Sequence, residues 1–425
     1  MPPARARTPV WLDCDPGHDD ALAILLAAFH PASHLIGVST VASNHTLPCV
    51  TRNAAAVLTA AGLAGTVPLV PGAARPLFGP PLACPSSHGH SGLCTGEGAF
   101  ADAVDATGAP GPAVLDAHPA PVEMARAIRA AHAALNAGCN HGGLAQRRVA
   151  LVATGALTNV ALLLWLYPSI AALISLSVMG GAVGAGNTHP VSEFNLAVDP
   201  HAGAAVFQAA GLVEGEDEDE AGRNGDGDGD GDGDGDGDGD APARLGSRTH
   251  SGAGPKNAAP SVAGEADAAD PPPLPVSLCP LEVTHTALVT PAALRAMGLE
   301  DGGACGRQLS PFKKAVRDLL LFFHASYAST FDGFAAGPPL HDPCAVLLAL
   351  ERGSFEMAEG VRVDVEAASP LCAGQTVVDL QRVTGRPPNA GVALRMKTER
   401  LWEVLGAAVG EADRRSPLNR GAGVV

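Results

Sequence analysis

The stretch DCDPGHDDALAILLA, residues 13–27, places four aspartates within eight positions and then continues as an apolar run. Asp13 and Asp15 are two residues apart, so on a β-strand their side chains would point to the same face. The proline and glycine that follow predict a turn. Asp19 and Asp20 would then begin a helix, whose free N–H groups favour anions. The stretch therefore predicts a strand, a tight turn and a helix, with all four carboxylates near the turn.

These carboxylates have two explanations. One aspartate could cap the helix, but a cap uses a single side chain and leaves the others unexplained. A hard divalent cation accounts for the whole group, because several carboxylates and a backbone carbonyl provide the oxygen ligands that Ca²⁺ prefers. The acidic cluster alone thus indicates metal binding and does not name a reaction.

Strand-like and helix-like segments alternate over the first 210 residues. The runs PVWLDCD and HLIGVSTVAS are β-like, and the Ala/Leu-rich stretches after them have apolar residues at helical spacing. Such alternation predicts an α/β fold, in which a mostly parallel open sheet carries helices on both faces. Ligands in such sheets bind outside the carboxyl ends of the strands, which is where the aspartates would lie.

The alternation stops between residues 212 and 275 and resumes at VSLCPLEVTHTALV. Eight Gly-Asp repeats run from Gly225 to Asp240, and a Ser/Ala/Gly/Pro-rich stretch follows. This composition buries too little apolar surface to offset its chain entropy, so we predict a disordered acidic insertion at residues 212–275. Because the sheet needs strands from both sides, we expect a single domain over residues 8–410 that contains the insertion.

Charge and cysteine content narrow the class of protein. The net charge is −17, but residues 214–240 hold fourteen acidic side chains and one arginine, so the rest of the chain is nearly neutral. Nucleic-acid binding needs clustered Lys and Arg and is not expected. No uninterrupted apolar run is long enough for a membrane span, and nine dispersed cysteines favour reduced thiols and a cytoplasmic location. The sequence leaves a homo-oligomer open.

The stretch DCDPGHDDALAI resembles the DxDxGxDDA motif of the inosine-uridine preferring nucleoside hydrolases. Further segments resemble this family in the same order, namely HGHSGL, VATGALTN, GNTHPVSEFNLAVDP, LHDPCAV, GQTVVDL and PNAGVAL. The resemblance covers about residues 8–211 and 276–405. It implies a Rossmann-like nucleoside hydrolase fold and Ca²⁺-dependent hydrolysis of the N-glycosidic bond of ribonucleosides, in purine and pyrimidine salvage. The implied partner is a small-molecule ribonucleoside.

The resemblance also implies a metal site. Asp15, Asp20, Asp342 and the backbone carbonyl of Thr154 would ligate Ca²⁺. Asp15 would in addition take the proton from the metal-bound water that attacks the sugar carbon, which is reasonable because water becomes more acidic on a metal. The resemblance implies no ligand role for Asp13, for which we expect a supporting one.

Substrate contacts are implied in the same way. Asp19 would hold the ribose 2′-hydroxyl, and Glu193, Asn195 and Asn187 would hold the 3′- and 5′-hydroxyls. Asn44 would reach the ribose or the attacking water. Without the family motif, Asn187 and Asn195 would be predicted as turn residues.

Two histidines are candidates for assisting the departing base. His341 stands beside Asp342, and the ordinary histidine pKa of about 6.5 suits a proton donor at neutral pH. The alternative for His341 is a core histidine that only orients Asp342. His88, in HGHSGL, is the second candidate.

The sequence departs from the family pattern in loops near the expected site. Ser43 and Cys94 stand where the family usually has glycine, and Ala156 stands where it has proline. None of these changes removes a carboxylate, but they leave the shape of the loops open. Tyr327 and Phe331 lie in the stretch where the family has base-lining aromatic residues, and the preferred base is not predicted.

Two other classes stay open. Asp13 and Asp15 have the Asp-x-Asp spacing of a haloacid-dehalogenase-like phosphohydrolase with Mg²⁺, although the proline and glycine that follow, and the EFN and HDP segments, have no role there. A non-catalytic acidic metal-binding protein built on the Gly-Asp run is the third class, but that run lacks the ligand order of an EF-hand.

Removal of the insertion tests its predicted independence from the core. We expect that replacing residues 214–270 by a short Gly/Ser linker leaves kcat and Ca²⁺ affinity largely unchanged, because loop-length terms are small, about 0.6 kcal/mol per doubling. Steady-state assays on the best ribonucleoside and a calcium titration measure both quantities. A deletion variant that does not fold, or that folds and is inactive, would contradict the prediction.

Overall fold

The computed structural model describes residues 7–82, 88–95, 98–137, 147–211, 274–300, 308–331 and 333–420. The predicted disordered insertion lies outside the described residues, except for its last two positions. Met1–Leu212 and Pro271–Val425 belong to one compact unit, so the segments on the two sides of the insertion pack together.

Within the described residues, nine strands form one sheet in the order β10-β9-β11-β8-β7-β6-β1-β2-β3. Their bounds are β1 Thr8–Cys14, β2 Ser33–Thr40, β3 Leu69–Pro71, β6 Val149–Ala153, β7 Ile174–Met179, β8 Val276–Cys279, β9 Phe355–Val365, β10 Thr376–Asp379 and β11 Ala390–Met396. All neighbouring pairs from β3 to β11 are parallel, whereas β9 runs antiparallel to β10 and β11. The predicted mostly parallel open sheet is confirmed, with an antiparallel edge. A short antiparallel pair, β4 Cys94–Thr95 and β5 Gly98–Ala99, forms a second sheet.

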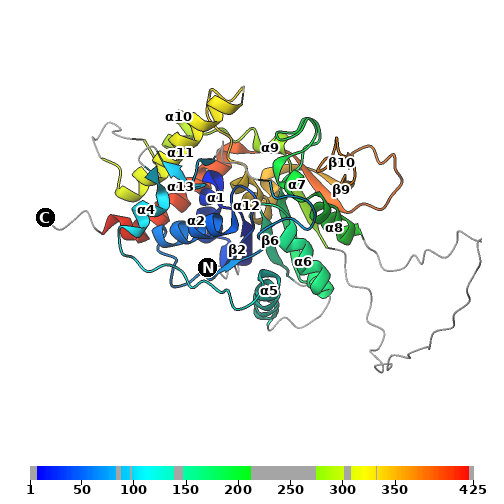
Figure 1. Ribbon diagram of the computed structural model, residues 1–425, viewed down its shortest axis with the longest axis horizontal. Coiled ribbons are helices and arrows are strands. Elements are labelled where there is room, and N and C mark those ends of the chain that lie inside the picture. Colours follow the sequence, from blue (N-terminus) through cyan, green and yellow to red (C-terminus); the bar gives the residue numbers. More distant parts are fainter. Residues whose placement is uncertain are drawn as a thin grey trace, which may run out of the picture. The chain divides into compact units, whose positions relative to one another are not determined.

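Helices cover both faces of the sheet, as predicted (Figure 1). On one face, a hydrophobic core takes side chains from α1 His18–Phe29, α2 Leu47–Ala60, α4 Phe100–Asp105, α11 Pro311–Thr330, α12 Asp342–Leu350 and α13 Thr398–Arg415. On the other face, a second core takes side chains from α5 Ala120–Asn136, α6 Thr158–Leu166 and α8 Pro200–Gly211. Shorter helices are α7 Phe194–Val198, α9 Leu281–Thr284 and α10 Pro291–Ala296.

The interior position of β1 follows from its sequence. Val10 and Leu12 belong to the core under α1, whereas Trp11 between them belongs to the core on the opposite face. Successive side chains of a strand point to opposite faces, so an unbroken apolar run predicts a strand that is covered on both. After Cys14 the chain turns, and α1 begins at His18, which confirms the strand, turn and helix predicted for residues 13–27.

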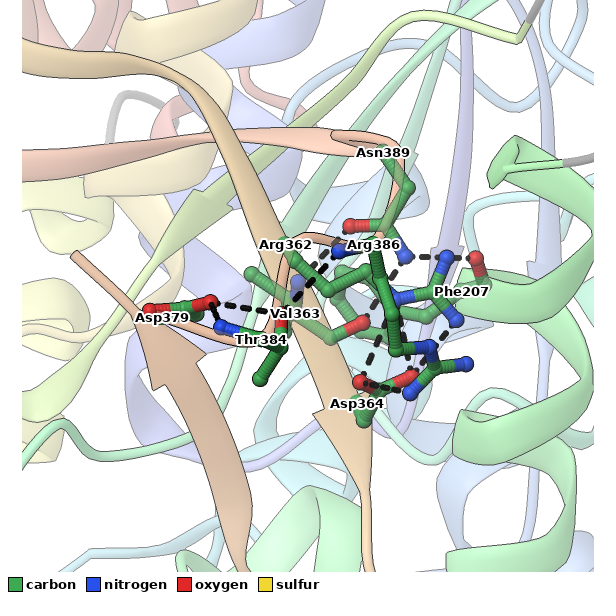
Figure 2. A network of polar contacts seen from close by, with 8 residues as sticks. All are labelled: Phe207, Arg362, Val363, Asp364, Asp379, Thr384, Arg386 and Asn389. Carbon is green, nitrogen blue, oxygen red and sulfur yellow. Dashed lines mark hydrogen bonds and ion pairs between the residues drawn. The ribbon is translucent and has the colours of Figure 1, made fainter. Parts of the chain in front are cut away.

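A polar network ties the antiparallel edge to α8 (Figure 2). The Asn389 side chain accepts a hydrogen bond from Val363 N at 2.7 Å and donates to the carbonyl oxygens of Val363 and Phe207, both at 2.8 Å. The largely buried Arg362 pairs with Asp364 at 2.7 Å. Because Phe207 lies on α8, these contacts fix the end of α8 against β9, and each buried hydrogen bond contributes about 1 kcal/mol.

The insertion joins α8 to β8. The described chain leaves α8 at Gly211 and resumes just before β8 begins at Val276, so both attachment points lie on the amino-terminal side of that strand. Among the described residues, none of the helices combines the length and the apolar character that crossing a bilayer requires.

Candidate active site

The candidate site lies at the carboxyl ends of β1, β6 and β7. Asp15 follows β1, Thr154 follows β6, and the segment of residues 180–199 follows β7. Asp342 begins α12, whose amino end approaches the same place, since His341 N donates a hydrogen bond to Asp19 Oδ2 at 3.2 Å. This is the edge of the sheet at which the alternating pattern predicted a ligand site.

Carboxylates converge here without exposure to solvent. Asp15, Asp19, Asp20 and Asp342 are all buried. Carboxylate oxygens of Asp19, Asp20 and Asp342 lie within 4.8 Å of one another, a spacing at which they could hold one metal ion. The predicted ligand set contained Asp15 in place of Asp19, so the structure brings together two of the three predicted carboxylates and adds Asp19.

The two carboxylate oxygens of the buried Asp15 differ in their hydrogen bonds. Asn44 N donates to Asp15 Oδ2 at 2.8 Å, and Asn44 Nδ2 donates to the Asp15 carbonyl at 3.2 Å. The second carboxylate oxygen, Oδ1, is buried and has no hydrogen-bond partner in the described part of the chain. A buried, unpaired carboxylate oxygen is costly unless a cation or a donor meets it, so Asp15 Oδ1 fits a metal site.

Asp20 is held by two donors. Its Oδ2 accepts from Gly17 N at 2.9 Å, and its Oδ1 accepts from the Thr154 hydroxyl at 2.9 Å. The Thr154 carbonyl, which was predicted as a ligand, accepts a hydrogen bond from Asn195 Nδ2 at 2.8 Å. A carbonyl oxygen has a second lone pair, so this bond leaves Thr154 able to ligate a cation.

Burial and mutual repulsion disfavour negative charge in this cluster. Burial, followed by the charge of Asp20, raises the pKa of Asp19 to about 7. The pKa values of Asp15 and Asp342 are raised well above their ordinary value, with burial again the larger cause and neighbouring carboxylates the next. Burial also raises the pKa of Asp20. A bound cation would offset both effects, because an opposite charge favours the ionised form.

A cavity adjoins the carboxylates. Its lining includes every predicted substrate-binding residue and both candidate histidines, namely Asp19, Asn44, Asn187, Glu193, Asn195, His88 and His341. Asp342 and Thr154 also line the cavity. The cavity therefore joins the acidic centre to the polar residues that were selected by motif.

Glu193 and its neighbours form a fixed polar wall. Glu193 caps α7, and its carboxylate accepts from Asn195 N and Gly181 N at 2.9 Å and from Leu196 N at 3.2 Å. Burial raises the pKa of Glu193 to about 7. Asn187 Oδ1 accepts a hydrogen bond from Phe194 N at 2.9 Å, and this bond fixes the orientation of the Asn187 amide.

His341 is enclosed by two hydroxyl groups. Its Nδ1 lies 2.8 Å from the Thr284 hydroxyl and its Nε2 lies 2.9 Å from the Tyr327 hydroxyl. Burial lowers the pKa of His341 to about 3, followed by the effect of His285. This differs from the ordinary value expected from the sequence, because burial penalises the charged imidazolium. At neutral pH the His341 ring is neutral.

His88 stacks on a histidine that the sequence analysis did not select. The rings of His88 and His18 are stacked at 5.4 Å, and their Nδ1 atoms lie 3.2 Å apart. His18 Nε2 lies 2.8 Å from the Cys94 carbonyl, so this nitrogen is the donor. Burial lowers the pKa of both rings, that of His18 to about 4. His18 stands inside the stretch that decides the fold, and its place beside Asp19 was the available signal.

One aromatic wall of the cavity comes from α11 and its end. Phe323, Tyr327 and Phe331 are spaced four residues apart, and their successive ring centroids lie 4.9 Å apart. Tyr327 and Phe331 were anticipated, whereas Phe323 was not. The spacing of four residues on one helix face was the signal that would have found Phe323.

Asp13 lies outside the cavity lining. Its Oδ1 accepts hydrogen bonds from the Ser39 hydroxyl and from Asn159 Nδ2, the latter at 2.8 Å. Its backbone carbonyl accepts from Thr154 N at 2.8 Å. Asp13 thus connects β1 to the residue that carries the predicted carbonyl ligand.

This fold and this site define an α/β enzyme whose buried acidic centre can hold a metal ion. The family model of the inosine-uridine preferring nucleoside hydrolases matches residues 10–215 and 257–403, and the chain belongs to this family. The resemblance seen in the motifs is confirmed. Membership makes the chain an N-glycosyl hydrolase of nucleoside catabolism, and it decides against the phosphohydrolase and the non-catalytic acidic protein.

Curated relatives match over almost their whole length. A probable ribonucleoside hydrolase of Dictyostelium discoideum is 30% identical over 403 residues, which cover 94% of each chain. The pyrimidine-specific ribonucleoside hydrolase RihA of Shewanella sp. (strain MR-7) is 30% identical over 398 residues, covering 93% of this chain and 94% of the relative.

Solved structures share the fold. The purine-preferring ribonucleoside hydrolase from Gardnerella vaginalis superposes with a TM-score of 0.65 at 20% identity, over 96% of this chain and 99% of the other. An inosine-guanosine nucleoside hydrolase superposes with a TM-score of 0.63 at 20% identity, over 95% and 98%.

The raised carboxyl pKa values predict how stability depends on pH and on a cation. Between about pH 6.5 and 7.5 the buried histidines still bind protons in the unfolded chain, and this raises stability with pH whether or not a cation is bound. The carboxyls of Asp13, Asp19 and Glu193, with pKa values of about 7, still bind more protons in the folded chain. Raising the pH from about 6.5 to 8 should therefore lower the stability of metal-free protein relative to that of cation-bound protein.

Thermal unfolding with a chelator and with Ca²⁺ measures this effect. We expect the Tm of chelator-treated protein to fall relative to that of Ca²⁺-bound protein over that pH range, so that Ca²⁺ raises the Tm most at the higher pH, because the cation replaces the protons. Asp342→Asn should weaken the response to Ca²⁺. A pH dependence that is the same with and without the cation would count against a metal site at these carboxylates.

Proposed function

We propose that this chain, as one catalytic domain over residues 8–410, hydrolyses the N-glycosidic bond of ribonucleosides to ribose and free base, with one bound Ca²⁺. The observation that carries the proposal is the convergence of buried carboxylates at a cavity lined by hydroxyl-binding side chains and aromatic rings. One relative is named pyrimidine-specific and one solved structure purine-preferring, so the base is the part of the substrate that varies among similar proteins.

Asp15, Asp20, Asp342 and the Thr154 carbonyl would hold the ion, and Asp19 adds a further oxygen at the same point. The unpaired Oδ1 of Asp15 supports this set, as do the raised carboxyl pKa values. Oxygen-only ligands at this density suit Ca²⁺. When bound, the ion supplies a Lewis acid that lowers the pKa of a water beside it.

Asp15 would accept the proton from the attacking water. The two hydrogen bonds from Asn44 hold one carboxylate oxygen and the backbone of Asp15, and the unpaired Oδ1 would take the proton. A general base must lie within hydrogen-bond reach of the proton that it removes and must have a fixed orientation. Asn44 thereby both orients Asp15 and lines the cavity.

The sugar would be held by both hydrogen-bond donors and acceptors. Asn187 uses its Oδ1 for Phe194 N, which leaves its NH₂ group to donate to a substrate hydroxyl. Asn195 uses its NH₂ group for the Thr154 carbonyl, which leaves its Oδ1 to accept. Glu193 and Asp19 are acceptors when ionised. A polyol such as ribose, whose hydroxyls both donate and accept, fits this arrangement.

The departing base would be assisted by His341 acting through Tyr327. The neutral His341 ring is fixed between Thr284 and Tyr327, and the Tyr327 hydroxyl belongs to a residue that lines the cavity. A tyrosine hydroxyl that is hydrogen-bonded to an imidazole can donate to a base nitrogen as negative charge develops there. His88 is the second candidate for this role and approaches the cavity from the side of His18.

Substitution of Asp15 tests its proposed role as the general base. Asp15→Asn keeps the shape of the side chain and removes both the proton acceptor and a charged ligand, so kcat should fall by at least about 10²–10⁴, the usual value of general-base catalysis. Asp116→Asn is the control for removal of one carboxylate, because Asp116 is exposed and does not line the cavity. Near wild-type turnover of Asp15→Asn on its best ribonucleoside, with the fold intact, would refute the assignment.

A change of leaving group tests His341. With His341→Ala, hydrolysis of inosine should slow by about 10²-fold or more, because its base needs a proton or a hydrogen bond on departure. A p-nitrophenyl riboside should slow little, because its leaving group needs neither. Tyr327→Phe should show the same substrate dependence. Equal losses on both substrates would instead assign His341 to packing or to the orientation of Asp342.

A further inference from the structure

The segment that carries the proposed sugar-binding residues, 180–195, is held by a second segment far along the chain. Ser192 and Gln375 form an isolated antiparallel bridge, and the Ser192 hydroxyl donates to the Ala373 carbonyl at 2.8 Å. Gly374 has a φ of +85°, and a side chain there would approach the Ala197 backbone to 2.6 Å. The turn before β10 is therefore pressed against residues 192–197 and leaves no space between them.

Thr376, the first residue of β10, makes the strongest of these contacts. Its buried hydroxyl donates to the Ala182 carbonyl at 2.6 Å and accepts from Ala182 N at 2.9 Å. One side-chain hydroxyl thus serves both polar groups of a backbone residue, as a neighbouring strand would. The adjacent Gly181 has a φ of +75°, and a Cβ there would lie 2.8 Å from Thr376 Cγ2.

The contact leads directly to Glu193. Gly181 N, next to Ala182, donates to Glu193 Oε2 at 2.9 Å. Thr376 fixes the peptides on both sides of Ala182 and packs against Gly181. It therefore restricts the backbone that carries the Gly181 N–H group, one of the three donors that orient the Glu193 carboxylate. The route from Thr376 to the cavity consists of two backbone residues and no mobile side chain.

We propose that Thr376 is a positioning residue for sugar recognition. It holds residues 180–195 in the arrangement with which Glu193, Asn195 and Asn187 meet the sugar hydroxyls, and it does so from the antiparallel edge of the sheet, apart from the carboxylates. The inference rests on the proposed function, since it assigns the purpose of the polar wall. Loss of the Thr376 hydroxyl should weaken selection of the sugar and leave cation binding intact.

The test compares Thr376→Val, which removes the hydroxyl and keeps the shape, with Thr376→Ser, which keeps the hydroxyl. The measured quantity is kcat/KM for a ribonucleoside relative to its 3′-deoxy and 5′-deoxy analogues. Thr376→Val leaves the two buried Ala182 groups without a partner, so we expect its KM to rise and its preference for the full ribose to fall by about tenfold. Thr376→Ser should restore the preference, and both variants should bind Ca²⁺ as the wild type does.

Thr384→Val is the matched control. The Thr384 hydroxyl donates to Asp379 at 2.6 Å in the loop after β10 and accepts from Arg386 N at 3.4 Å, so both of these bonds stay within residues 379–386. If Thr376→Val does not fold, Ser192→Ala removes a weaker tie between the same two segments and should show a smaller loss of preference. An unchanged preference in the folded variants, or an equal loss in Thr384→Val, would overturn the inference. A wild-type chain that hydrolyses no ribonucleoside would instead refute the proposed function.

Discussion

Placing several carboxylates together out of contact with water is the constraint on which the rest of this structure depends. Burial opposes the charged forms of Asp15, Asp19, Asp20 and Asp342, and repulsion by neighbouring carboxylates adds to it for Asp15, Asp19 and Asp342. Hydrogen-bond donors partly compensate for this by pointing at the carboxylates of Asp15 and Asp20. They are the Gly17 N–H group, the Thr154 hydroxyl and the Asn44 N–H group. These donors come from the ends of different strands, so the sheet order itself is what brings the compensating groups to one point.

The parallel part of the sheet could be predicted because most of its strands are followed by a helix with its own periodicity. The antiparallel edge could not, because β9 was not identified from the sequence and an apolar pattern says nothing about the direction of a strand. Strand direction there is decided by tertiary contacts such as the Asn389 network, which joins residues that are far apart in the sequence. The insertion makes this packing harder to predict, because it separates α8 in the sequence from β9 and Asn389.

The residues around the candidate site could be selected from the sequence where a motif carries them, whereas properties that depend on burial could not, and the roles of these residues stay predictions. The carboxylates, Asn44 and the polar wall were selected from the sequence, and they line or adjoin one cavity. The shifted pKa of His341 could not be anticipated, because it depends on how completely the ring is enclosed. The same holds for His18, whose contact with His88 joins a helix start to a loop that lies 70 positions away.

The attachment of the long acidic segment between α8 and β8 has a consequence for engineering this chain. The candidate site lies at the carboxyl ends of the strands, whereas the segment joins at the amino end of β8, beside α8 and the edge that Asn389 holds. Exposed connections of this kind are the positions at which inserted domains are best tolerated. A reporter domain placed there would be joined at the end of the sheet opposite the candidate site.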